Sequence, residues 1–242
     1  MRFILVLILC SGYVQAQVGC LVGGYVFGTS TSRSFGRYAD MINSQPGVTD
    51  KLSNFWFAHG YEVGFEIPNL IVSAGVLNLH YRRMISHTSY TSNTTGKVDF
   101  NLRQNQYTAS IIIGDVSEKG DLAFFVNVPI GYLSSTINHT IENLPNFRRE
   151  YSGGQIVMGF GVSSYAMIKR RLGLYLKLLW IGHMIPIKDL KPELFDKSFY
   201  DSNNPDMDSY YLNYTYKGEN QRVRADFRGI SAEIGLIFIL FP

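Results

Sequence analysis

The chain has few charges, little cysteine and no long apolar run. Charged residues make up 17% of its 242 residues, against roughly 25% in ordinary globular proteins. The formal net charge of +3 is too small for the strongly basic surface of a nucleic-acid-binding protein. No stretch approaches the roughly 20 apolar residues that a membrane-spanning helix needs. We therefore expect neither a nucleic-acid partner nor a helical membrane anchor.

The amino terminus has the pattern of a secretory signal. Arg2 precedes an apolar run over residues 3–10, and Val14-Gln15-Ala16 fits a small-residue cleavage site. We predict a signal peptide over 1–16 and an exported mature domain over 17–242. Cys10 would leave with the signal, so Cys20 remains alone and no internal disulfide can form. Gly19 before Cys20 leaves a lipid anchor open.

What the sequence does contain is alternation with a period of two, which is typical of strands. The clearest example is the stretch 229–241. Its even positions are all apolar: Ile230, Ala232, Ile234, Leu236, Phe238 and Leu240. Its odd positions begin with Ser231, Glu233 and Gly235. One face of this strand therefore meets an apolar environment over its whole length.

Six further stretches alternate in the same way, and the apolar, glycine-rich stretch 20–28 is a strand whose faces the sequence leaves ambiguous, which predicts eight strands in four hairpins. The strands are expected at 20–28, 55–67, 71–85, 97–114, 121–133, 154–167, 172–183 and 229–241. Short turns at 68–69, 115–120 and 168–171 alternate with long polar loops at 29–54, 86–96, 134–153 and 185–225. The first loop has room for a short helix over 38–43. A change of parity along 97–114 predicts a bulge at Gln104 to Gln106.

This arrangement predicts an all-β fold, an eight-stranded antiparallel up-and-down transmembrane β-barrel with short periplasmic turns and long extracellular loops. A soluble lipocalin, with the apolar face inside, is the alternative. The uniform apolar face favours the membrane barrel, because the other face mixes small residues with charges. We expect an inward charge network made of Glu62, Glu66, His80, Arg82, Lys177, His183 and Glu233. Such a network either plugs the lumen or lines a narrow ion path.

Two loop patterns are weaker candidates for chemistry. Asp201, Asn203, Asp206 and Asp208 offer oxygen ligands for calcium but lack the EF-hand spacing. His87-x-Ser89 resembles the outward His-x-Ser of outer-membrane lipid A deacylases, in which the His would activate the Ser hydroxyl. No carboxylate is evident in the sequence to orient this His. We expect neither pattern to be functional, and no metal, cofactor or catalytic residue.

The terminal strand carries the most specific motif. Glu233-x-Gly235-x-x-Phe238-x-Leu240 resembles the membrane-insertion signal of bacterial outer-membrane barrels. With the signal peptide and the eight strands, the chain resembles the small outer-membrane β-barrel proteins of Gram-negative bacteria, particularly the Bacteroidota-type porin-like family. The resemblance implies an outer-membrane location and contacts with outer-membrane lipid, lipopolysaccharide and the barrel-assembly machinery.

The role of the barrel is less constrained than its fold. We expect a non-catalytic structural or interaction barrel that displays extracellular loops to a protein partner, as an accessory subunit of a secretion or transport complex. A narrow porin-like channel and a lipid A-modifying hydrolase built on His87 and Ser89 are the alternatives.

Overall fold

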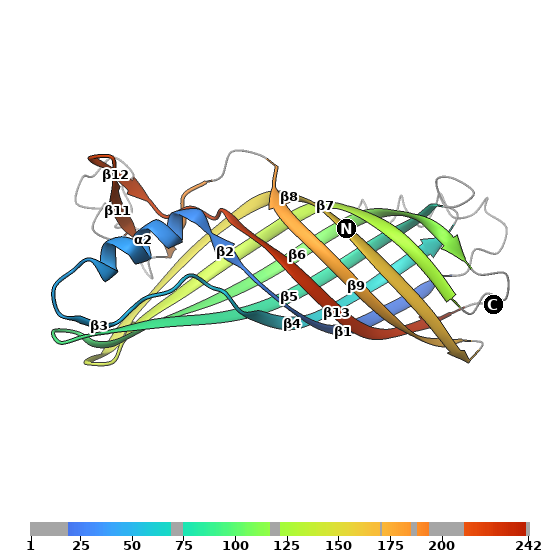
Figure 1. Ribbon diagram of the computed structural model, residues 1–242, viewed down its shortest axis with the longest axis horizontal. Coiled ribbons are helices and arrows are strands. Elements are labelled where there is room, and N and C mark those ends of the chain that lie inside the picture. Colours follow the sequence, from blue (N-terminus) through green and yellow to red (C-terminus); the bar gives the residue numbers. More distant parts are fainter. Residues whose placement is uncertain are drawn as a thin grey trace.

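The computed structural model describes residues 19–68, 75–116, 122–169, 171–184, 188–193 and 211–240. Within them, eight antiparallel strands form a closed barrel (Figure 1). The strands are β1 (Cys20–Gly28), β4 (Ala58–Pro68), β5 (Gly75–Ser92), β6 (Gly96–Val116), β7 (Leu122–Ile141), β8 (Leu144–Lys169), β9 (Leu172–His183) and β13 (Phe227–Ile239). Each strand pairs with the next along the chain, and β1 pairs with β13 to close the barrel. The predicted fold is confirmed.

The alternation of the sequence decides which side chains face outward. On β13 the exposed side chains are those at even positions, from Ile230 to Phe238, while Ser231 and Glu233 are buried inside. The same division holds on β9, where Leu174, Leu176, Leu178 and Trp180 are exposed and Lys177 is buried. Closure leaves no free strand edge between the eight strands, which a membrane environment requires.

Both ends of the barrel chain lie at the same end of the barrel. Cys20, the first residue of β1, pairs with Ile239, the last residue of β13. The connection between β8 and β9 at this end is as short as predicted, since β8 ends at Lys169 and β9 begins at Leu172. The predicted turn at 68–69 falls partly outside the described residues, and so does the turn at 115–120. The predicted signal peptide lies wholly outside them.

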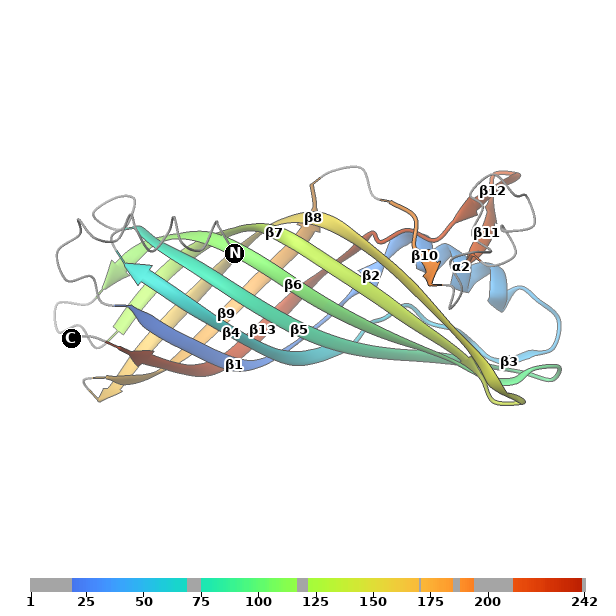
Figure 2. The same cartoon turned by 180° about the vertical axis from the view of Figure 1, so that it is seen from behind.

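Two of the predicted long loops are wrong. Residues 86–96 and 134–153 mostly belong to strands, because β5 to β8 continue far beyond the other strands at the opposite end (Figure 2). The turns that remain there are short, over 93–95 and 142–143. These stretches were mistaken for loops because their outward side chains meet water. A polar outward face breaks the apolar pattern by which the other strands are recognised.

The predicted bulge at Gln104 to Gln106 is also wrong. Gln104 pairs with Met84 and Ser135, and Gln106 pairs with Arg82 and Leu133, without a break in register. Even-numbered residues of β6 face inward from Val98 to Ile112. What changes is the environment: near Tyr107 the outside is apolar and the inside polar, whereas near Phe100 the reverse is true.

The loops predicted at 29–54 and 185–225 contain regular structure. The first contains β2 (Thr31–Ser32), α2 (Arg33–Asn43) and β3 (Val48–Asp50), and the second contains β10 (Lys191–Glu193), β11 (Asn213–Tyr216) and β12 (Glu219–Arg222). Figures 1 and 2 place α2, β11 and β12 at the end reached by the long strands. We call these six elements the outer cap. The predicted short helix is therefore present, and it begins earlier than expected.

Helix α2 begins where the side chain of Ser32 accepts a hydrogen bond from the backbone N–H of Phe35. Its buried face carries Phe35, Tyr38, Ala39 and Ile42, which is the spacing of one apolar helix face. This face packs with inward side chains of the long strands, including Phe100, Leu102 and Ile137. The largest apolar cluster of the described residues thus lies at the cap end of the barrel.

Candidate functional site

An apolar band surrounds the barrel below the outer cap. Five consecutive strands carry outward tyrosines within it, and these are Tyr25, Tyr61, Tyr81, Tyr107 and Tyr132. The band ends where outward side chains become polar, at Asn105 after Tyr107 and at Ser134 after Tyr132. An exposed apolar band with aromatic residues on a closed barrel is the surface that lipid requires. The chain is an integral outer-membrane protein.

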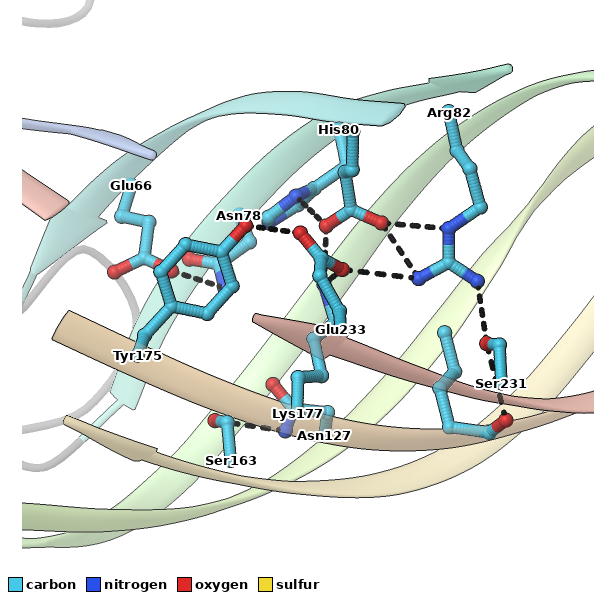
Figure 3. Close-up of polar contacts among 12 residues, drawn as sticks. Glu66, Asn78, His80, Arg82, Asn127, Ser163, Tyr175, Lys177, Ser231 and Glu233 are labelled. Atoms are coloured by element: carbon cyan, nitrogen blue, oxygen red, sulfur yellow. Dashed lines mark hydrogen bonds and ion pairs between the residues drawn. The ribbon is translucent and has the colours of Figure 1, made fainter. Parts of the chain in front are cut away.

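Inside the band, two acids and two bases form a buried network (Figure 3). Arg82 Nε donates to Glu62 Oε2 at 2.7 Å, and Arg82 Nη2 lies 3.3 Å from Glu233 Oε2. Lys177 forms an ion pair with Glu62, and its Nζ lies 3.5 Å from Glu233 Oε2. All four side chains are less than a tenth exposed. The network therefore pairs two basic side chains with two acidic ones.

Side chains of Ser231, Tyr175 and His80 add further polar contacts to this network. Arg82 Nη1 donates to Ser231 Oγ at 2.8 Å, and the Tyr175 hydroxyl donates to Glu233. His80 Nδ1 lies 2.5 Å from Glu62 Oε1. Buried charges that keep this many partners hold a fixed geometry, because losing any partner leaves a charge uncompensated. The network therefore links β4, β5, β9 and β13 through the centre of the barrel.

Glu66 lies inside the same lumen with neutral partners. Its Oε1 accepts hydrogen bonds from Tyr165 at 2.7 Å and from Asn78 at 3.1 Å. Five of the predicted members thus form one connected cluster around Glu62 and Glu233, and Glu66 lies in the same lumen; the five are Glu62, His80, Arg82, Lys177 and Glu233. Asn127 adds a separate inward contact, donating to Ser163 Oγ at 3.0 Å.

His183 was wrongly predicted as a member of the network. Its position in β9 has the inward parity of Lys177, but it is the last residue of the strand and its side chain is exposed. Gly182, beside it, is buried, so the alternation breaks at this strand end. His183 instead lines a cavity beneath the outer cap.

The lumen is filled on the cap side of the network. A cavity of about 30 Å³ lies between Arg82, Gln104 and Phe227, which is room for about one or two waters. Beyond it lies the apolar cluster that includes Phe35, Phe55 and Phe100. From the charge network toward the outer cap, the lumen is therefore occupied first by polar side chains and then by apolar ones.

The structure gives His87 the carboxylate that the sequence did not reveal. His87 Nε2 lies 2.8 Å from Asp99 Oδ1 on β6, and Asp99 is the direct strand partner of Ser89. Lys97 Nζ also contacts this carboxylate, at 3.1 Å. Partial burial alone would raise the pKa of Asp99, but the hydrogen bonds and charges of His87 and Lys97 outweigh it and hold that pKa below its usual range. No hydrogen bond between His87 and Ser89 occurs in this part of the described chain.

His87 lines a cavity with the exposed apolar side chains of Phe57 and Ile85, whereas Ser89 lies beyond the apolar band. Ile85 is the last exposed apolar side chain on β5 before His87, and Ser89 is two residues further out. A hydrolase acting on the acyl chains of a lipid would need its nucleophile at the band edge. His87, Asp99 and Lys97 form a surface ion cluster, and Ser89 lies beside it.

The residues of the terminal motif have separate places in the barrel. Glu233 belongs to the lumen network, and Phe238 faces outward within the band. Gly235 lies beneath Tyr175, where a Cβ atom would come within 2.6 Å of the tyrosine ring. Leu240 follows the last residue of β13, and its N–H donates to the Gly19 carbonyl. Cys20 has its side chain partly buried against an interior cluster.

Sequence reasoning missed several inward residues that complete the network. Tyr175, Tyr165, Asn78 and Ser231 all have inward parity, so strand alternation alone could have identified them. The candidate calcium ligands Asp201, Asn203, Asp206 and Asp208 lie outside the described residues. Among the residues that are described, no three His, Cys, Asp or Glu side chains are grouped to hold a metal ion, and no helix is long and apolar enough to cross a membrane.

Known structures share this fold, although no family model matches the chain and no curated protein matches it in sequence. The outer membrane protein OprG from Pseudomonas aeruginosa is 8% identical, with a TM-score of 0.51, over 94% of this chain and 98% of that one. Neisserial surface protein A is 9% identical, with a TM-score of 0.47, over 91% and 96%. Ail of Yersinia pestis, solved with the heparin analogue sucrose octasulfate, is 7% identical, with a TM-score of 0.49, over 93% and 100%. The fold of this chain is that of the small eight-stranded outer-membrane β-barrels.

Proposed function

We propose that this protein is a non-catalytic, non-conducting outer-membrane barrel that presents its outer cap as a binding surface outside the cell. The observation that carries the proposal is the buried network of Glu62, Arg82, Lys177 and Glu233. Its members reach one another from strands on different sides of the lumen. An eight-stranded barrel is just wide enough for side chains to fill, so these contacts leave ions no free path.

The outer cap supports a binding role. A barrel whose role lay entirely within the membrane would need no ordered helix or hairpin outside it. Here α2 is packed on the long strands, and β11 pairs with β12 in a separate two-stranded sheet. A rigid surface loses little conformational entropy when it binds a partner. The partner class that we propose is a protein or glycan at the cell surface, including the components of a secretion or transport complex.

We further propose membership of the Bacteroidota-type porin-like barrel family, with assembly by the barrel-assembly machinery. The terminal motif from Glu233 to Leu240 supports this assignment. The motif residues Glu233 and Gly235 also have packing roles in the finished barrel, because Glu233 joins the lumen network and Gly235 makes room for Tyr175.

Conductance in planar lipid bilayers tests the proposal. The protein is expected to give no discrete current steps under conditions in which a general porin does. A narrow channel would instead give steps whose size or ion selectivity changes in Lys177→Gln or Glu62→Gln, and that result would contradict the proposal. The variant Trp56→Phe changes a residue on the outer surface and leaves the lumen unchanged. It is the control for the two lumen variants and should behave like the wild type.

A further inference from the structure

A cavity of about 300 Å³ lies outside the lumen, where the outer cap meets the barrel wall. Four arginines line it: Arg33 and Arg37 of α2, Arg224 after β12, and Arg228 of β13. His183, at the end of β9, lines it as well. These residues are far apart in the sequence, and the pairing of β2 with β13 brings the start of α2 to the barrel wall (Figure 1).

Within the described part of the chain, the positive charges around this cavity are not balanced by carboxylates. Among the described residues, Asp226 is the one carboxylate that lines it, and Asp226 is buried. Its oxygens accept hydrogen bonds from the Ser34 N–H and from the hydroxyls of Ser32 and Ser34. Asp226 therefore occupies the start of α2 together with the cap residue Ser32, so an anion in the cavity would depend on the arginines and not on the helix N-terminus.

The arginines themselves have few ionic partners. Arg224 Nε lies 3.6 Å from Asp189 Oδ1, in an exposed pair. The Arg37 guanidinium stacks on Tyr216, 3.6 Å from the ring centre. For Arg33 and Arg228, no carboxylate of the described chain lies within ion-pair distance. Four guanidinium groups around one cavity repel one another, and a bound anion would remove that repulsion.

The cavity lies at the edge of the apolar band. Ile230 is exposed in the band and pairs with Trp180 of β9. Arg228 is the next outward side chain of β13 beyond Ile230, and His183 lies three residues beyond Trp180. In a bilayer, the edge of the apolar band corresponds to the level of the lipid headgroups.

We propose that the arginine cavity binds the phosphate groups of a phosphorylated sugar headgroup, supplied by the glycolipid of the outer leaflet. Arginine presents a planar pair of donors that matches phosphate oxygens, and such contacts are stronger than neutral hydrogen bonds. The position at the band edge favours a lipid over a soluble phosphate ester. This inference names a ligand class for the surface proposed above and rests on that proposal for its biological role, but not for binding itself.

Lipid binding by the detergent-purified full chain tests the inference. The probes are diphosphorylated lipid A, the same lipid without phosphates, and soluble inositol hexakisphosphate, with bound lipid measured by native mass spectrometry. The chain is expected to bind the phosphorylated lipid in preference to the dephosphorylated one. In Arg33→Gln/Arg228→Gln its affinity should fall by about tenfold or more, since each change removes charge-assisted hydrogen bonds. Added salt should weaken wild-type binding.

A matched control removes two charges elsewhere. Lys51→Gln/Arg148→Gln changes exposed side chains that do not line the cavity, and it should bind like the wild type. Equal loss in both double variants, or no loss in either, would overturn the assignment of the cavity. Binding of inositol hexakisphosphate but not of lipid A would overturn the lipid source. Neither result depends on conductance, so failure here is distinct from failure of the proposed function.

Discussion

Arg82 and Glu233 meet across the barrel, although their strands are not neighbours. Arg82 belongs to β5 and Glu233 to β13, with β4 and β1 between them, and Arg82 Nη2 lies 3.3 Å from Glu233 Oε2. The same guanidinium binds Glu62 on the adjacent strand. Arg82 therefore connects two separate parts of the barrel wall, β4 and β13. Its side chain also occupies space in the lumen that would otherwise be open.

Removing this arginine should strongly destabilise the barrel. Arg82→Met leaves Glu62 and Glu233 with Lys177 as their remaining cation, and breaking a buried ion pair from one side costs about 3–5 kcal/mol. Unfolding by guanidinium chloride in detergent measures the loss in the free energy of unfolding. Arg83→Met is the control, since Arg83 faces outward on the same strand and should change the free energy of unfolding by about 0.5 kcal/mol or less. Equal effects of the two changes would contradict an inward role for Arg82.

Two adjacent glycines of β1 should differ in their tolerance of alanine. At Gly24, an added Cβ would lie 2.6 Å from the Tyr175 hydroxyl and 2.6 Å from the Ile234 carbonyl oxygen. At Gly23, on the outer face, the nearest atom would be 3.8 Å away. Gly24→Ala should therefore lower the free energy of unfolding by about 1–3 kcal/mol through overpacking. Gly23→Ala should leave it nearly unchanged, and a larger effect at Gly23 would reverse the assignment of faces.

The cap end should lose stability in acid through His139. This imidazole is stacked on Phe100 at 4.5 Å, and burial, helped by the charge of Arg149, lowers its pKa to about 4. The unfolded chain has the ordinary value of about 6.5, so it binds more protons than the folded chain between these two pH values. Stability from the neutral imidazole is complete above pH 6.5 and falls as the pH drops toward 4.

The variant His139→Leu isolates this effect from the titration of carboxylates. Its free energy of unfolding, measured at pH 7 and at pH 4.5, should fall less than that of the wild type. An equal fall in both proteins would show that His139 is not buried as a neutral group.

Ser89→Ala should leave outer-membrane lipid unchanged. His87 has a carboxylate partner in Asp99, but Ser89 lies beyond the apolar band and makes no hydrogen bond to His87. Mass spectrometry of lipid A from cells that express the wild type or Ser89→Ala is the measurement. A deacylated lipid A that appears with the wild type and is lost in Ser89→Ala would establish the hydrolase instead.

The sequence was most informative where the barrel lies in the membrane. All eight strands were predicted, because the face that meets lipid must be apolar and the face that lines the lumen carries small and polar residues. Inward parity also identified Glu62, Arg82, Lys177 and Glu233. The prediction of loops at 86–96 and 134–153 failed because these strand segments lie beyond the band. There the outward side chains are polar, and the inward side chains pack against the apolar side chains of the outer cap. There the inward and outward faces exchange character at Gln104 to Gln106, which looked like a bulge.

Other features depend on contacts that alternation does not encode. His183 has inward parity, but β9 ends there and its side chain turns outward. The Asp99 partner of His87 is set by strand register between β5 and β6. The arginine cavity joins residues near position 33 with residues near position 228, which come together only when β13 pairs with β2.

The most direct test of the membrane-spanning barrel is the environment of Trp180. The chain has two tryptophans, so Trp56→Phe leaves Trp180 as the one fluorophore of its kind. Trp180 is half exposed on the outward face of β9, within the apolar band. In bilayers of lipids with brominated acyl chains, its fluorescence should be strongly quenched. Fluorescence that brominated lipids leave unchanged would mean that this face does not meet lipid, as in a soluble barrel with its apolar face inside.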